Sequence, residues 1–241
     1  MLQPHIQLDN LGTKYALLAG DPARLDRIAC QLNQVQELAY NREFRSLKGL
    51  YNDVPVLAMS TGIGGSSMSI AVEELSKIGV TSMIRIGSCG ALQKGIKVGD
   101  LIIGAGCVRD DGASAAYVNI KYPAVPNCDV LNAILQSVED YPHHVGIIHS
   151  HESFYIDENE EEEKYWSKKG VLGADMESAA LMVVGRLRGV KTASILNNVV
   201  EYGKDTADSI NEYSDGINLS ARGEQKEIEV ALKAFYLMEH K

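Results

Sequence analysis

The segment YALLAGDPAR, residues 15–24, joins a short apolar run to a glycine, an aspartate, a proline and an arginine. Tyr15–Ala19 has the length and composition of a buried strand. Gly20 follows it directly and lets the backbone come close to an anion, because glycine has no side chain in the way. Arg24 adds a planar, permanently charged guanidinium beside this turn. The segment therefore predicts a strand whose end binds an anion.

Two other segments supply arginines in a similar setting. One contains Arg42, and the other is RIGSCG at residues 85–90, which contains Arg85. Arg85 lies among apolar residues of a predicted strand, where a charged side chain is costly to bury unless it is paired. Ser88 can donate a hydroxyl hydrogen bond to the same anion. A single arginine of this kind is more often a surface residue, but the set predicts a site for free phosphate, and hence phosphate as a reactant.

The rest of the chain alternates short apolar runs with helical patterns. Such alternation predicts an α/β fold in which helices cover a largely parallel sheet. The predicted strands are residues 15–19, 42–51, 54–60, 82–87, 100–108, 145–150 and 192–197. The predicted helices are residues 22–38, 66–78, 130–138, 160–169, 174–188 and 221–238.

The composition limits the possible classes of protein. The chain has 241 residues, 45% of them hydrophobic, and a formal net charge of −9, which suits one compact domain over residues 1–241. An acidic chain is a poor candidate for binding nucleic acid or an anionic membrane. Four cysteines without a CxxC pair predict reduced thiols and a cytoplasmic location. We also expect no signal peptide, and no stretch approaches the ~18 apolar residues of a membrane span.

Four other features have a structural interpretation beside a functional one. The segment STGIGGSS at residues 60–67 is either a tight turn or a helix N-terminus that binds polar ligand groups. Glu177 opens a predicted helix, where it complements the helix dipole or holds a sugar diol. The acidic run at residues 157–163 is solvated surface or a mobile flap. The histidines between residues 143 and 151 lack a third ligand at metal-binding spacing, so we predict no metal site.

Together these segments resemble the nucleoside phosphorylase-I family, which holds uridine phosphorylases and hexameric purine nucleoside phosphorylases. The resemblance runs from Pro4 to about Asn198. It rests on GDPxR at residues 20–24, NREF at 41–44, STGIGG at 60–65, RIGS at 85–88 and the pair Met176-Glu177. It implies a single-domain, three-layer α/β/α fold with a central mixed, partly barrel-like sheet surrounded by helices.

The resemblance also implies a role for each matching residue. The implied phosphate-binding residues are Gly20, Arg24, Arg85, Ser88 and, donated by a neighbouring subunit, Arg42. The implied ribose-binding residues are Met176, Glu177 and, also donated, His5. The implied base-binding residues are Cys89, Gly90, Phe154, Tyr155 and Asp175. The implied catalytic residues are Arg85, Glu177 and, as a candidate acid, Glu201.

The reaction that the resemblance implies is phosphorolysis of a nucleoside to free base and ribose 1-phosphate. Nucleoside and phosphate are then the small-molecule partners, and no cofactor is expected beyond phosphate as co-substrate. Because residues are donated by a neighbour, the resemblance implies a homo-oligomer. A dimer is its minimal unit, and a hexamer built as a trimer of dimers is the expected assembly.

The base is the open part of this prediction. Much of the sequence favours the uridine branch, but Glu158 and Glu160 replace the Gln and Arg with which uridine phosphorylases read uracil. Purine phosphorylases protonate the base with an Asp, and here an ungapped alignment puts Val199 at that position while a two-residue shift puts Glu201 there. We predict a uridine phosphorylase-like enzyme with altered base recognition. A purine nucleoside phosphorylase and a non-catalytic nucleoside-binding homologue stay as alternatives, whereas a nucleosidase is disfavoured because nucleosidases lack the arginine set.

Overall fold

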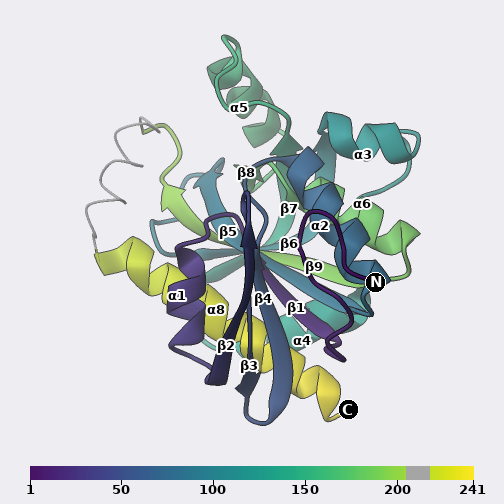
Figure 1. The fold of residues 1–241 in the computed structure, drawn as a ribbon. Coiled ribbons are helices and arrows are strands. Elements are labelled where there is room, and N and C mark those ends of the chain that lie inside the picture. Colours follow the sequence, from purple (N-terminus) through teal and green to yellow (C-terminus); the bar gives the residue numbers. More distant parts are fainter. Residues whose placement is uncertain (205–217) are drawn as a thin grey trace.

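The computed structural model describes residues 1–204 and 218–241, and its centre is a nine-stranded mixed sheet (Figure 1). In sheet order the strands run β2-β3-β4-β1-β5-β8-β7-β6-β9. Their bounds are β1 Tyr15–Ala19, β2 Asn33–Asn41, β3 Phe44–Tyr51, β4 Val54–Ser60, β5 Ser82–Ala91, β6 Leu101–Asp110, β7 His143–His151, β8 Gly173–Asp175 and β9 Lys191–Val200.

Five of these strands close into a barrel. Strand β5 pairs with β8 on one edge and with β9 on the other, and β8, β7, β6 and β9 are joined in turn. The remaining four strands extend the sheet outward from β5, with β1 and β4 parallel to it and a β2–β3 hairpin at the end. The predicted mixed, partly barrel-like sheet is confirmed.

Helices cover both faces of this sheet. Their bounds are α1 Arg24–Ala29, α2 Gly65–Lys77, α3 Gly112–Tyr117, α4 Cys128–Val138, α5 Asn159–Ser167, α6 Ser178–Leu187 and α8 Asn218–Glu239. Strand β1 alternates between two cores: Leu17 packs with α1, α4 and α8, whereas Leu18 packs with α2 and α6. This alternation places one helical layer on each face, so the three-layer arrangement is confirmed. Helix α5 stands apart from both layers, beyond β8 (Figure 1).

Two predicted elements are wrong in part. The helix predicted at residues 22–38 ends at Ala29, and residues 33–41 form the edge strand β2. Because β2 pairs with β3 alone among the described strands and is mostly exposed, it lacks the apolar alternation of a half-buried strand. The helix predicted at residues 174–188 begins at Ser178, since Gly173–Asp175 is the short strand that completes the barrel. Strand β2, strand β8 and helix α3 were not predicted, and the other elements agree within a few residues.

Strand β5 changes partners in its middle, and this creates an opening in the sheet. Strand β1 follows β5 as far as the pair Ala19↔Ile86, and β8 joins the same edge at Gly90↔Ala174. Between them, residues 87–89 have no neighbour on that edge within the described residues. Strand β5, which was predicted to end at Gly87, continues past this gap to Ala91. Such a switch of partners is where α/β sheets bind ligands.

In the part of the chain that the structure describes, no helix has the length and apolar character needed to cross a membrane.

Candidate active site

A cavity of about 820 Å³ opens at the gap in β5. It brings together ten of the predicted site residues: Gly20, Arg24, Arg85, Ser88, Cys89, Gly90, Phe154, Asp175, Met176 and Glu177. We call the part around Gly20, Arg24, Arg85 and Ser88 the arginine end. The part around His151, Phe154, Asn159 and Glu163 is the α5 end.

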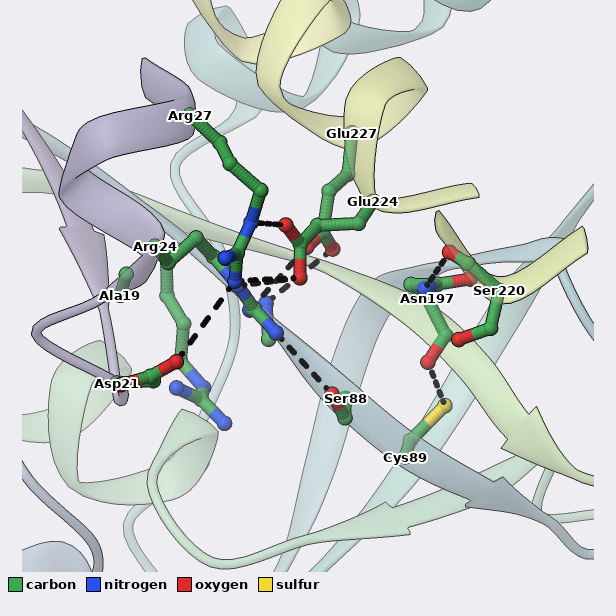
Figure 2. A network of polar contacts seen from close by, with 12 residues as sticks. Ala19, Asp21, Arg24, Arg27, Ser88, Cys89, Asn197, Ser220, Glu224 and Glu227 are labelled. Carbon is green, nitrogen blue, oxygen red and sulfur yellow. Dashed lines mark hydrogen bonds and ion pairs between the residues drawn. The ribbon is translucent and has the colours of Figure 1, made fainter. Parts of the chain in front are cut away.

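At the arginine end, the described partners of Arg24 include Ser88, Glu224 and Glu227 (Figure 2). Its Nη2 donates to the hydroxyl of Ser88 at 3.2 Å, and its Nε donates to Glu224 Oε2 at 3.0 Å. Its Nη1 lies 3.2 Å from Glu227 Oε1. Although Arg24 is only 4% exposed, it lines the cavity, so a buried, pre-oriented cation faces any ligand there.

Arg85 is the second buried cation of this end. Its Nε donates to Asp175 Oδ2 at 3.1 Å, and its Nη2 donates to Glu177 Oε2 at 2.5 Å. Gly87 makes room for it, because a Cβ there would lie 2.6 Å from Nη2. Burial acts to lower the pKa of Arg85, but the charges of Glu177 and Asp175 outweigh burial and raise it. Nη1 has no hydrogen-bond partner among the described residues, so one donor of the fork is left for a ligand.

Glu177 connects the arginine end to the loop before α2. Its Oε1 accepts the backbone N–H of Gly64 at 2.5 Å while Oε2 binds Arg85. Burial raises the pKa of Glu177, and the charge of Arg85 opposes that shift. A carboxylate fixed from two sides and still lining the cavity can accept two hydroxyl hydrogen bonds. It is placed to hold a vicinal diol next to an anion.

Two predicted residues lie outside this cavity but close to each other. The side chain of Asn41, next to Arg42, donates to the backbone carbonyl of His5 at 2.8 Å. The ring of His5 meets Glu74 at 2.6 Å between Nδ1 and Oε1. Arg42 itself has a positive φ of 55° and does not line the cavity. The structure therefore places His5 and Arg42 near each other outside the cavity of this chain.

The α5 end is different from its sequence prediction. Phe154 lines the cavity, whereas Tyr155 is 86% exposed and packs edge-on against Phe154 at 4.8 Å between ring centroids. Glu158 and Glu160 do not line the cavity; Asn159 and Glu163 do. Asn159 Nδ2 donates to Glu163 Oε1 at 3.1 Å. An amide and a carboxylate, one helical turn apart, thus face the cavity together.

Three further predicted residues have contacts that bear on their roles. Asp175, expected at the base, accepts hydrogen bonds from Arg85 and from Ser178. Burial raises the pKa of the Cys89 thiol well above its usual value, so it stays neutral. Glu201 borders a separate hollow of about 230 Å³ and pairs with Lys204 at 3.1 Å, whereas Val199 lines the main cavity. The role of Glu201 as an acid stays a prediction.

Several residues of the site were not predicted from the sequence. They are Asn159 and Glu163 on α5, His151 at the end of β7, and Glu224 and Glu227 on α8. Both α8 glutamates sit on the buried face of an amphipathic helix, next to Ile228, with 2% and 0% exposure. A charged residue at a core position is costly unless it is paired, so this placement was a usable signal. For Asn159 and Glu163 the spacing of four residues was the signal.

The chain is similar in sequence and in fold to known phosphorylases. A family model for the phosphorylase superfamily matches residues 14–220. A guanosine phosphorylase of Halorubrum lacusprofundi is 36% identical over 216 residues, covering 87% of this chain and 89% of that protein. A crystal structure of uridine phosphorylase from Vibrio fischeri ES114 has a TM-score of 0.91 at 43% identity, covering 98% of this chain and 97% of that one.

A purine nucleoside phosphorylase of Toxoplasma gondii, crystallised with immucillin-H, has a TM-score of 0.89 at 28% identity, covering 99% of this chain and 97% of that one. The predicted family is confirmed by these matches. The chain belongs to the phosphorylase superfamily and is one of its nucleoside phosphorylases.

Proposed function

We propose that the cavity binds phosphate at its arginine end and the nucleoside across Glu177 toward its α5 end. The observation that carries this is the union, in one cavity, of two buried guanidiniums, the Ser88 hydroxyl and a fixed carboxylate. Guanidiniums suit phosphate oxygens, and the carboxylate suits the ribose 2′- and 3′-hydroxyls. Met176, beside Glu177, lines the same cavity and is placed to contact the sugar.

The reaction follows from these charges. A phosphate oxygen attacks C1′ as the C1′–N bond to the base breaks, and the electron pair of that bond leaves with the base. The sugar becomes cationic in the transition state, where the phosphate dianion and Glu177 stabilise it. The base departs as an anion or takes up a proton, and ribose 1-phosphate remains. No cofactor is needed, because phosphate is the nucleophile and its positioning supplies much of the rate.

We also propose a homo-oligomer in which a neighbouring subunit completes each site. His5 and Arg42 lie near each other outside the cavity of this chain, and Ile63 at the cavity rim is 78% exposed. A facing subunit would cover this apolar side chain and receive both donated residues. A dimer is the minimal unit of this proposal and a hexamer the expected assembly.

The four cysteines are free thiols, which supports the predicted cytoplasmic location.

The first candidate substrate is uridine, the substrate named for the Vibrio fischeri relative. A second candidate, a 6-oxopurine nucleoside, is favoured by the pair Asn159–Glu163. Guanine presents a carbonyl beside two N–H groups, which an amide donor and a carboxylate match. Uracil presents one N–H between two carbonyls, so a carboxylate there would face an oxygen that repels it. The guanosine phosphorylase relative is consistent with this second candidate.

The test is release of free base from uridine, thymidine, inosine, guanosine and adenosine, with and without phosphate. Phosphate-dependent release from any of them supports phosphorolysis, and the preferred substrate decides between the two candidates. Release that does not need phosphate would replace the proposal by a nucleosidase. Binding of nucleoside without any release would replace it by the non-catalytic homologue.

A further inference from the structure

Among the residues that the structure describes, the buried carboxyl groups around the arginine end outnumber the buried guanidiniums. Asp175, Glu177, Glu224 and Glu227 have side chains no more than 6% exposed, and they contact Arg24 and Arg85, whose side chains are 5% and 4% exposed. A third guanidinium, that of Arg27, also binds Glu224, but its side chain is 49% exposed. If all four acids were ionised, a phosphate dianion would enter a site whose buried charge is already negative. Buried charges need partners, so this is unfavourable.

Glu227 is the acid of this set with the weakest support for its charge. Its side chain is completely buried on α8. Oε2 accepts the backbone N–H of Gly87 at 3.2 Å, and Oε1 approaches Arg24 Nη1 at 3.2 Å without a hydrogen bond from any described residue. Glu224 and Glu177, by contrast, each accept hydrogen bonds from a guanidinium.

The position of Glu227 connects it to the phosphate site through two groups. Arg24 lines the cavity and also lies against Glu227 (Figure 2). Gly87, which donates to Glu227, lies in the gap of β5. An ionised Glu227 therefore competes with phosphate for the charge of Arg24. A neutral Glu227 removes one competitor for that charge, while Glu224 still binds Arg24 through Nε. A dianion bound nearby in turn favours the neutral acid, because like charges repel.

We propose that Glu227 is a positioning residue that is protonated whenever phosphate is bound and takes the proton from solvent where the free enzyme has lost it, so that the dianion meets an Arg24 whose charge is not shared with an ionised Glu227. The inference rests on the proposed phosphate site and adds a proton to it. Ribose 1-phosphate carries the same dianionic group, so the proton stays on Glu227 until that product leaves.

The charged groups around Glu227 set the pH at which it gains or loses this proton. Burial raises the pKa of Glu227 to about 8; Arg24 from α1 and Arg85 from β5 lower it, and Glu224 from α8 raises it. The Cys89 thiol of β5 stays neutral, since its own pKa is raised well above its usual value. In the free enzyme Glu227 is thus protonated below about pH 8, and the effect of its charge appears above that pH.

The experiment measures binding of sulfate to the full-length enzyme by calorimetry, from about pH 6.5 to 9.5. Sulfate stays a dianion over this range, so the titration of phosphate itself does not intrude. We expect the sulfate Kd to rise about tenfold per pH unit above about pH 8. Near pH 9, buffers of different ionisation heat should report uptake approaching one proton per site. In Glu227→Gln both effects should vanish, and sulfate should bind with one Kd throughout.

Glu224→Gln is the matched control, because it removes a carboxylate from the same arginine. It should retain the pH dependence but shift it to lower pH, since the charge of Glu224 raises the pKa of Glu227. If Glu227→Gln does not fold, this shift and the proton uptake of the wild type decide the matter. A wild-type Kd that is independent of pH, or an unchanged pH dependence in Glu227→Gln, overturns the role of Glu227 but leaves the phosphate site standing. Failure of both sulfate and phosphate to bind overturns the proposed phosphate site as well.

Discussion

The arginine end and the α5 end of the cavity are built in opposite ways. At the arginine end, Arg24 and Arg85 are 4% and 3% exposed and are fixed by acids from β8, α8 and the start of α6. At the α5 end, Asn159 and Glu163 belong to a helix that buries none of its residues. One end is part of the protein core, and the other is attached to its surface.

Because of this difference, a substitution has a different cost at each end. A substitution at the arginine end leaves a buried charge without its partner, which is costly. A substitution on α5 changes a half-exposed side chain and disturbs little packing. On the proposed assignment of the two ends, phosphate binding is therefore fixed by the fold, whereas the preferred base is set by a few replaceable residues. Relatives of this chain named for uridine, guanosine and purine nucleosides fit that division.

The largest expected effect comes from Arg85→Ala. Phosphate loses a buried guanidinium, and Asp175 and Glu177 lose their shared partner. We expect kcat/KM for phosphate to fall by about 10²–10³-fold, mostly through KM. Steady-state kinetics with varied phosphate measures this, and circular dichroism checks the fold. Arg85→Lys keeps the charge but loses the fork, so it should recover part of the loss.

Arg188→Ala is the control for that variant. Arg188 also pairs with a glutamate, Glu73, at 2.6 Å, but its side chain is 41% exposed and lies outside the cavity. Its kinetics should match the wild type. An Arg85→Ala enzyme with an unchanged phosphate KM would remove Arg85 from the phosphate site, and the two ends would no longer differ in the way described.

A smaller effect is expected from Glu163→Gln at the α5 end. If the carboxylate reads a 6-oxopurine, removing its charge costs about 1–2 kcal/mol, or roughly a fivefold to thirtyfold loss of kcat/KM for guanosine. The kcat/KM for uridine should hold or rise, because the carboxylate no longer faces a carbonyl of uracil. The ratio of the two values is the measurement, and thermal stability should barely change.

Glu160→Gln is the matched control on the same helix. Glu160 pairs with Lys164 at 2.5 Å and does not line the cavity, so both substrates should behave as in the wild type. A Glu163→Gln enzyme that loses uridine and guanosine cleavage equally would show that Glu163 does not discriminate between bases.

The sequence was informative where residues of the site lie close together in the chain and a residue type is unusual for its position. Arg85 in an apolar strand and Gly20 after β1 identified the arginine end, because a charge in an apolar strand needs a partner and a glycine at a strand end admits an anion. The α5 end was harder to predict. The resemblance directed attention to Glu158 and Glu160, which do not line the cavity, whereas Asn159 and Glu163, four residues apart on α5, do.

The parts of the fold that were missed depend on tertiary contacts. Strand β2 forms because it pairs with β3, and its own residues carry little strand pattern. Strand β8 is three residues long and forms because the barrel closes there. Glu227 lies more than a hundred residues from Gly87, so their contact follows from the placement of α8.

The last expected effect concerns folding stability, not catalysis, and is specific to the arginine end: it is the pH dependence of the stability of Glu227→Gln. The pKa of Glu227 is raised from its usual 4.5 to about 8 on folding, so the folded state binds a proton that the unfolded state has lost. This contribution to stability is complete below about pH 4.5 and is lost as pH rises toward about pH 8. Glutamine does not titrate, so the stability gained by the variant over the wild type should grow with pH by up to about 1.4 kcal/mol per unit across that window. It should then level off. Thermal melts of both proteins at matched pH measure this difference in stability. The contributions of all other titrating groups are the same in the two proteins and cancel.

A difference in stability that does not change with pH would mean that Glu227 is ionised in the folded enzyme, so that its charge would add to the buried negative charge of the arginine end.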